Sequence, residues 1–248
     1  MPRGLGSDPT APAGESSAQH LTGRGVIPEP WIDEGGQSEV SAKERLNPFR
    51  RRYLKVRSDA TAGEASYQVL LALTGGPAEG FNFPDDEFIS YLDSLNVNAD
   101  WVMRMNILPA KKAASRNKRA EEKLNDEYNQ QSGDSHAITG GSTRLDRIAE
   151  DLTAYHAALN SSESEVSVDA TVIFAVGAPT AEIAQDHANA IVRAYESREF
   201  KVTTPLGYQE ELWWAALPGT PSSATVKKLE LLATGRHLAF GVPLVTDA

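Results

Sequence analysis

The sequence predicts an α+β fold in which two strand–helix–strand units form one sheet, with helices on one face of it and an antiparallel helical hairpin inserted between the units. Two observations lead to this prediction. A β-rich run followed by a helical period and a further β-rich run occurs twice, and a long stretch of helical periodicity separates the two occurrences. The chain has 248 residues, which is enough to bury a substantial core.

The first unit spans residues 67–108. Residues 67–73 are rich in β-forming side chains and end at the turn signal 74–77. Pro84 and the three acidic residues after it predict a helix start, because proline fits the first turn and acids face the positive end of the helix dipole. Residues 101–108 alternate in polarity, which predicts a half-buried strand.

The helical hairpin is predicted over about residues 109–160. Pro109 opens a first helix that runs to about residue 131, a polar and glycine-rich turn follows, and a second helix begins near residue 143. Apolar residues on the second helix alternate at spacings of three and four, a heptad-like seam formed by Leu145, Ile148, Leu152, Tyr155 and Leu159. A thinner seam on the first helix predicts that the two pack antiparallel.

The second unit consists of a strand at 166–176, a helix from about residue 180 to residue 197 and a short strand at 200–204. The sequence therefore divides into an α+β domain at 48–204 and a C-terminal helical segment at 205–248. Residues 1–47 are rich in proline, glycine, serine and acids, which predicts a disordered tail. The apolar island around Trp31 is either a docking peptide for a partner or a strap on the domain's own surface.

Composition narrows the classes of function. A net charge of −10 argues against a general nucleic-acid binder, because a phosphate backbone would be repelled. The chain has no cysteine, which removes disulfides, thiol nucleophiles and cysteine-bound metals. No apolar run approaches the roughly 20 residues that span a bilayer, and the N-terminus has no signal pattern. We expect a cytoplasmic protein whose contact with the inner face of the membrane would come through a partner.

The sequence offers no residue that we assign to catalysis, to a cofactor or to a metal. The phosphate-binding pattern G-x-x-x-x-G-K-[ST] and the nucleophile pattern G-x-S-x-G are both absent. The five histidines are scattered, and no two lie four residues apart on one helix. The acids 85–87 resemble a paired-carboxylate site, but three acids in a first helical turn normally act on the helix dipole.

Two basic segments are candidates for contact with an anionic partner. The residues are Arg50, Arg51 and Arg52 in one segment and Lys111, Lys112, Arg116 and Arg119 along one helix. The plainer interpretation is a set of solvated charges paired with nearby acids.

Four aromatic residues are candidates for a protein interface: Trp31, Tyr208, Trp213 and Trp214. Adjacent tryptophans on a helix cannot both face the core, so we predict that Trp213 or Trp214 points away from it and is unusually exposed.

The run at 208–219, Tyr-Gln-Glu-Glu-Leu-Trp-Trp-Ala-Ala-Leu-Pro-Gly, resembles the N-terminal domain of type IV secretion and conjugation ATPases, the CagE/TrbE/VirB class. The resemblance covers about residues 53–248. It extends over the strands at 67–73, 100–104 and 168–176, the basic residues of the hairpin and the segment 232–244, and it rests on their order and spacing.

This resemblance implies a non-catalytic docking domain that binds inner-membrane components of a bacterial DNA-transfer channel and contributes to hexamer assembly. ATP and Mg²⁺ would belong to a C-terminal motor domain, toward which residues 205–248 would lead. Two alternatives stay open. One is a nucleic-acid-binding accessory protein of a mobile element that uses the two basic segments. The other is a small-molecule enzyme on an α+β scaffold, which predicts a deep pocket with convergent titratable groups.

Overall fold

The computed structural model describes residues 31–57, 64–77, 80–82, 85–133, 140–162 and 164–242. The strands are β1 (Trp31–Glu34), β2 (Leu54–Arg57), β3 (Ala65–Gly75), β4 (Ala99–Pro109), β5 (Val166–Ala178), β6 (Lys201–Thr203) and β7 (Leu231–Thr234). The α-helices are α1 (Phe88–Ser94), α2 (Ala110–Gly133), α3 (Gly140–Leu159), α4 (Ala181–Glu196), α5 (Gln209–Ala216) and α6 (Gly235–Gly241).

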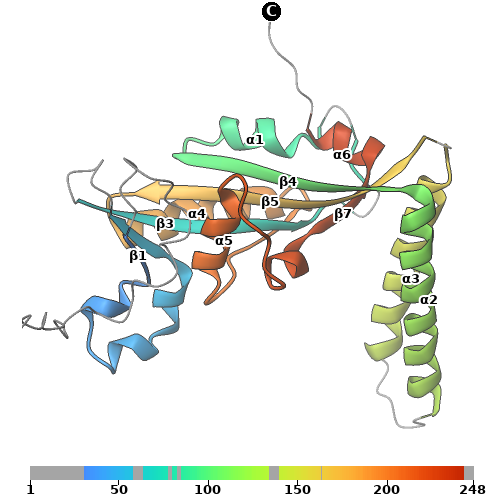
Figure 1. Cartoon of the computed structure of the whole chain (residues 1–248), viewed down its shortest axis with the longest axis horizontal. Helices are drawn as coiled ribbons and strands as arrows, with labels where there is room; N and C mark the ends of the chain where they lie inside the picture. The colour runs from blue at the N-terminus through green and yellow to red at the C-terminus, as the bar shows by residue number, and fades with distance from the viewer. Residues whose placement is uncertain are drawn as a thin grey trace, which may run out of the picture.

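The seven strands of the described residues join one antiparallel sheet in the order β1-β2-β3-β5-β4, with β6 added beside β3 and β7 beside β5 (Figure 1). The long strand β5 lies in the middle. It pairs along its length with β4 on one side, and with β7 and then β3 on the other. The α+β class predicted from the sequence is confirmed.

The larger core lies on the face of the sheet that α1, α4 and α6 cover. Alternate residues of β3 and β5 point into it, among them Val69, Leu71, Val172 and Phe174, all fully buried. The buried Tyr195 of α4 donates its hydroxyl hydrogen to the Phe88 carbonyl, which ties α4 to α1. Burial raises the pKa of the Tyr195 hydroxyl above its usual 10.

The helices of the two predicted strand–helix–strand units, α1 and α4, share one face of the sheet as predicted. Helix α5 belongs to the segment 205–248, outside these units. This helix packs on the opposite face, where Leu212 and Ala215 meet Leu70 of β3 and Ile173 of β5 in a smaller cluster. The reason is visible in the strands. Residues of β3 and β5 that point to either face are apolar and fully buried, so both faces need a cover.

The predicted helical hairpin is confirmed. Helix α2 begins directly after β4, α3 leads back to β5, and the pair stands away from the sheet (Figure 1). Of the predicted seam, Leu145 and Leu159 are buried, whereas Ile148 is 42% exposed. The apolar seam of α3 is therefore covered only over part of its length.

Two boundaries predicted from the sequence need correction. Residues 31–34 form β1 and pair with β2, so the part of the predicted tail that includes Trp31 belongs to the sheet. Residues 1–30 and Pro84 lie outside the described residues. The helix predicted from Pro84 starts only at Phe88, because Asp85 has a φ of 119°, which no helix can continue.

The acids that follow Pro84 hold the turn that precedes α1. The Asp86 carboxylate accepts from the Asn82 amide at 2.7 Å, and the Glu87 carboxylate accepts from the Asp85 amide at 2.8 Å. Their contacts in the structure are local ones, in a loop.

Candidate docking surfaces

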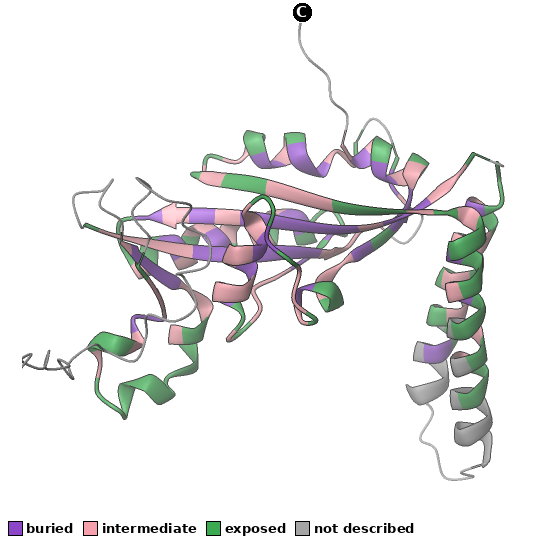
Figure 2. Cartoon of the chain, in the orientation of Figure 1, coloured by how far each residue is buried: buried purple, intermediate pink, exposed green. Residues whose placement is uncertain are grey.

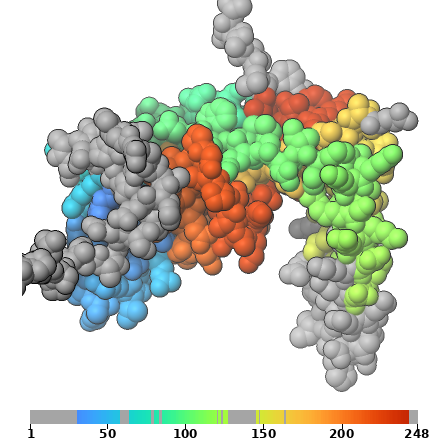
Figure 3. Space-filling model, in the orientation of Figure 1, coloured from blue at the N-terminus to red at the C-terminus, as the bar shows by residue number. Residues whose placement is uncertain are grey.

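Strand β4 forms one edge of the sheet. Within the described residues its only strand partner is β5, and the other side of its eleven residues is unpaired. Figure 2 shows β4 as exposed and half-buried, in contrast to the buried strands behind it, and Figure 3 shows its atoms along the surface of the molecule. The predicted half-buried strand is thus a long open edge.

The side chains of β4 that point to the α1 face form an apolar row. Trp101, Met105 and Ile107 are 38%, 52% and 58% exposed, and Met103 between them is half-buried. Their register partners in β5 belong to the larger core, so this row continues the core toward the edge. We call Trp101, Met103, Met105 and Ile107 the edge row.

The backbone of the edge row also faces outward. Just before β4, the Asn98 carbonyl accepts from the Gly177 amide of β5 at 3.4 Å. Because backbone groups alternate in direction along an antiparallel strand, the odd-numbered residues of β4 direct their N–H and C=O groups to the free side. The same residues therefore offer apolar side chains and unpaired backbone groups, which is the combination used in strand addition.

The other face of β4 is fixed by Arg104. Its guanidinium donates to the Ala215 carbonyl at 3.1 Å, to the Thr220 hydroxyl at 3.4 Å and to the Thr220 carbonyl. This contact holds the chain that leaves α5 against the edge strand. This contact was not predictable from the sequence, since the two partners are 111 and 116 residues away.

The paired tryptophans do not behave as predicted. Trp213 donates to the Gln68 side-chain oxygen at 3.0 Å, and Trp214 donates to the Glu210 carboxylate at 3.4 Å. The two rings stack edge-on with centroids 5.0 Å apart, and both side chains are half-buried. Neither ring is the unusually exposed one that the sequence predicted, because each finds a partner within its own domain.

Tyr208 and Trp31 are the more exposed aromatic candidates, at 43% and 39%. Trp31 lies on β1 under the Arg57 guanidinium, 5.1 Å from the ring centroid. Trp31 is therefore part of the β1 edge of the sheet.

Gln209, which sequence analysis did not single out, closes a gap in the sheet. On one side of β3, β2 pairs with residues 65–68 and β6 pairs from residue 72 onward, so Leu70 faces neither strand. The fully buried Gln209 side chain accepts from the Leu70 amide at 2.8 Å and donates to the Leu70 carbonyl at 3.0 Å. It replaces the missing strand partner at this position.

The root of the hairpin is an ion pair between α2 and β5. Arg116 donates to both carboxylate oxygens of Asp169 at 2.7 Å and to the buried Ser167 hydroxyl at 2.9 Å. Burial lowers the pKa of the Arg116 guanidinium, but the hydrogen bond and charge of Asp169 outweigh it and raise the pKa overall. Burial, together with the nearby Asp169, raises the pKa of Glu230. Arg116 thus anchors the hairpin, a role that sequence analysis missed.

The remaining basic candidates fall into two separate groups. Arg50 donates to the Gly35 carbonyl at 3.0 Å and the Arg52 guanidinium lies 5.0 Å from the centre of the Phe49 ring, while Arg51 is exposed. Lys111, Lys112 and Arg119 are exposed on α2. Figure 1 shows the segment before β2 and the helix α2 at opposite ends of the molecule, so the two groups do not form one basic surface.

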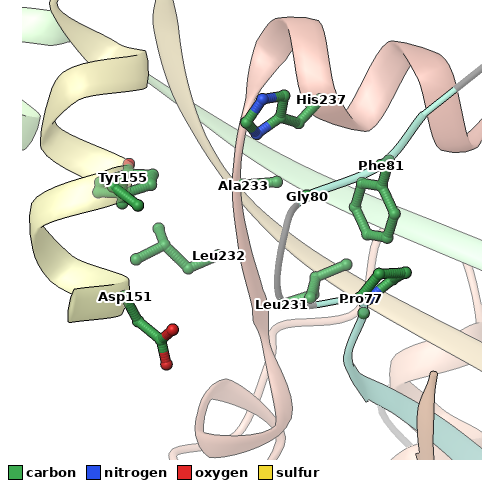
Figure 4. A pocket seen from close by; sticks show the side chains of 11 residues that line it. Pro77, Gly80, Phe81, Asp151, Tyr155, Leu231, Leu232, Ala233 and His237 are labelled. Carbon is green, nitrogen blue, oxygen red and sulfur yellow. The ribbon is translucent and has the colours of Figure 1, made fainter. Parts of the chain in front are cut away.

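A small cavity lies where α3, α6 and β7 meet the loop around Gly80 (Figure 4). Its volume is about 220 Å³. Its titratable side chains include Asp151 and His237, which lie at opposite ends with Leu232 and Ala233 between them. These two groups do not converge on one point, as a general acid and base would.

Comparisons with known proteins add no assignment: no family model matches the chain, and no curated protein matches it. Within the described residues there is no group of three histidine, aspartate or glutamate side chains that could hold a metal ion. In the same part of the chain, no helix is long and apolar enough to cross a membrane.

Proposed function

We propose that this chain is a non-catalytic docking and assembly domain of a conjugative-transfer (type IV secretion) ATPase. It would bind inner-membrane components of the transfer channel and lie at the inner face of the membrane through them. ATP hydrolysis would belong to a separate motor domain. The family is proposed from the resemblance carried by residues 208–219 and the strands before them.

The observation that supports docking is the α2–α3 hairpin. The sheet itself does not need it, because Pro109 at the end of β4 and Val166 at the start of β5 are direct register partners that a short turn could join. Instead α2 alone has 24 residues, or about 36 Å of helix at 1.5 Å per residue. The hairpin adds a long surface away from the sheet.

Its attachment favours a rigid arm. Arg116 donates through Nη1 to both Asp169 carboxylate oxygens and through Nη2 to the Ser167 hydroxyl, and charge-assisted hydrogen bonds are roughly twice as strong as neutral ones. Asn117 on the next position is buried, while Lys111 and Lys112 are exposed on the outer surface. A partner would therefore meet a charged helix face held in a fixed direction.

The test is capture of partners in cells that carry a conjugative-transfer channel. A photo-crosslinking amino acid replaces Lys112 on the hairpin, and a matched one replaces Lys228, which is also exposed, in the short 3-10 helix Val226–Leu229. We expect the hairpin position to capture inner-membrane channel proteins and the control position to capture none.

A second variant separates docking from folding. Residues 110–165 are replaced by an Asn-Gly turn that joins β4 directly to β5. We expect this variant to unfold cooperatively, like the full chain. We also expect it to be absent from the membrane fraction of the cells, where the full chain should be found. A full-length chain that captures only DNA, or nothing, at the hairpin would overturn the proposed function.

A further inference from the structure

The β4 edge is a long surface that has no strand partner on its outer side among the described residues. Its eleven residues span about 37 Å at 3.4 Å per residue. An exposed, regular and apolar edge is a template for pairing with another strand, and most proteins block such edges with charges, proline or bulges. Within β4 the register with β5 runs without a break, and Pro109 stands only at the end.

We propose that β4 of one copy pairs antiparallel with β4 of a second copy of this chain, so that two seven-stranded sheets become one continuous sheet. The inference rests on the geometry of the edge and is independent of the proposed function. It assigns the edge row as the centre of a two-fold interface.

The edge is complementary to itself. In an antiparallel pair around a two-fold axis, the outward-facing odd residues of one strand meet the odd residues of the other. A register centred on Met103 places Trp101 of each copy opposite Met105 of the partner copy, which brings a thioether against an aromatic ring. The apolar rows of the two copies would then join on one face of the sheet.

Apolar overlap and charge together favour this register. It keeps the edge row within the partner's β4 and places Arg104 opposite Val102, diagonal to both Asp100 and Arg104 of the second copy. A register centred on Arg104 would instead oppose two guanidinium groups directly, which is unfavourable. A register centred on Val102 would oppose Arg104 directly to Asp100, but it would move Ile107 past the start of the partner's β4.

Size and charge set the expected strength. A single strand pair buries less than the roughly 800 Å² per partner of a standard interface. The dimer should therefore be weak and should dissociate when the protein is diluted. Each copy carries a net charge of −10, which opposes association at low salt. Added salt should therefore strengthen the dimer, in contrast to an interface held by ion pairs.

Engineered cysteines test the register, since the chain has none of its own. Residues opposed in an antiparallel pair have Cα atoms about 4.5–5.5 Å apart, within the range that a disulfide bridges. We expect Met103→Cys to crosslink with itself under mild oxidation, and Trp101→Cys to crosslink with Met105→Cys when the two variants are mixed. Ile183→Cys on α4, 40% exposed, is the control and should stay monomeric.

Sedimentation of the full chain tests the dimer without crosslinking. We expect the mass to rise from 26.8 kDa toward twice that value with concentration, and to stay at the monomer value in Met105→Arg. Ile183→Arg should dimerise as the wild type does. The proposal is overturned if the wild type stays monomeric at every concentration, if Met105→Arg still dimerises, or if the control cysteine crosslinks as well as Met103→Cys.

Discussion

The two edges of the sheet differ in length and in how they are closed. The β1 edge has four residues, and charged side chains surround it: Lys55 and Arg57 of β2 pair with Glu39, and Arg57 covers Trp31. The β4 edge has eleven residues, and its outward row is apolar. We call the first edge closed because charged side chains flank it, which hinders strand addition, and the second open because its outward row is apolar.

The gap beside β3 at Leu70, between β2 and β6, also contrasts with the β4 edge, because its backbone groups have partners. There the chain buries Gln209 to satisfy a single residue's backbone, Leu70. A fold that satisfies one amide and one carbonyl so completely, yet leaves a whole strand edge unpaired, points to a partner for that edge. The unpaired backbone along β4 is therefore the feature of the sheet that most clearly indicates a binding surface.

The largest expected effect comes from reopening the β3 gap. Gln209→Leu keeps the volume but leaves the Leu70 amide and carbonyl buried without partners, at about 1–3 kcal/mol each. We expect the free energy of unfolding to fall by about 2–6 kcal/mol, measured by urea denaturation. Gln185→Leu is the control, because the Gln185 side chain is only half-buried where it donates to the Arg52 carbonyl at 3.1 Å. Equal losses in both variants would refute a special role for Gln209.

The next effect concerns the root of the hairpin, where β4 leaves the sheet. Asp169→Asn removes the charge that Arg116 binds through two hydrogen bonds at 2.7 Å. Hydrogen bonds to charged groups contribute about 1.5–3 kcal/mol, so we expect a loss of that size in unfolding free energy. Amide hydrogen exchange should rise first at the base of α2. Unchanged exchange there would show that the hairpin is held by its apolar contacts instead.

Whether an element can be predicted from the sequence depends on whether its contacts are local or distant along the chain. Periodicity is local, so the strands near residues 67–73 and 166–176 and the seam from Leu145 to Leu159 were predictable. The β1–β2 pair was not, because a four-residue strand carries little periodicity of its own. The same limit applies to the four-residue β7: the sequence analysis assigned residues 232–244 to the end of the domain but predicted no strand there.

The candidate sites depended on distant partners. Nothing near Arg116 in the sequence reveals Asp169, 53 residues away, and nothing near Gln209 reveals Leu70, 139 residues away. Alternation did predict that residues 101–108 form a half-buried strand. It could not show that this strand lies at the edge of the sheet, since sheet order is set by long-range pairing.

A smaller effect, dependent on pH, is expected at the closed edge. The hydrogen bond from Lys55 and the charges of Lys55 and Arg57 lower the pKa of Glu39 below its usual 4.5. Its ionised form therefore stabilises the fold at pH values above 4.5, and this contribution is lost as the pH falls through the lowered pKa. We expect Glu39→Gln to be less stable than the wild type at neutral pH and the two unfolding curves to converge in acid. A difference that persists at low pH would point to packing rather than charge.

The smallest effect on stability is expected at the open β4 edge. A substitution there tests directly whether the β4 edge differs from the β1 edge in binding a partner. Ile107 is 58% exposed, so Ile107→Lys should change the unfolding free energy by no more than about 0.5 kcal/mol. The same charge should lower self-association strongly, because a lysine on an edge strand blocks pairing. Unfolding and sedimentation measured on one sample separate the two quantities. If stability fell with association unchanged, the edge row would belong to the fold of the single chain, and the two edges would differ only in length.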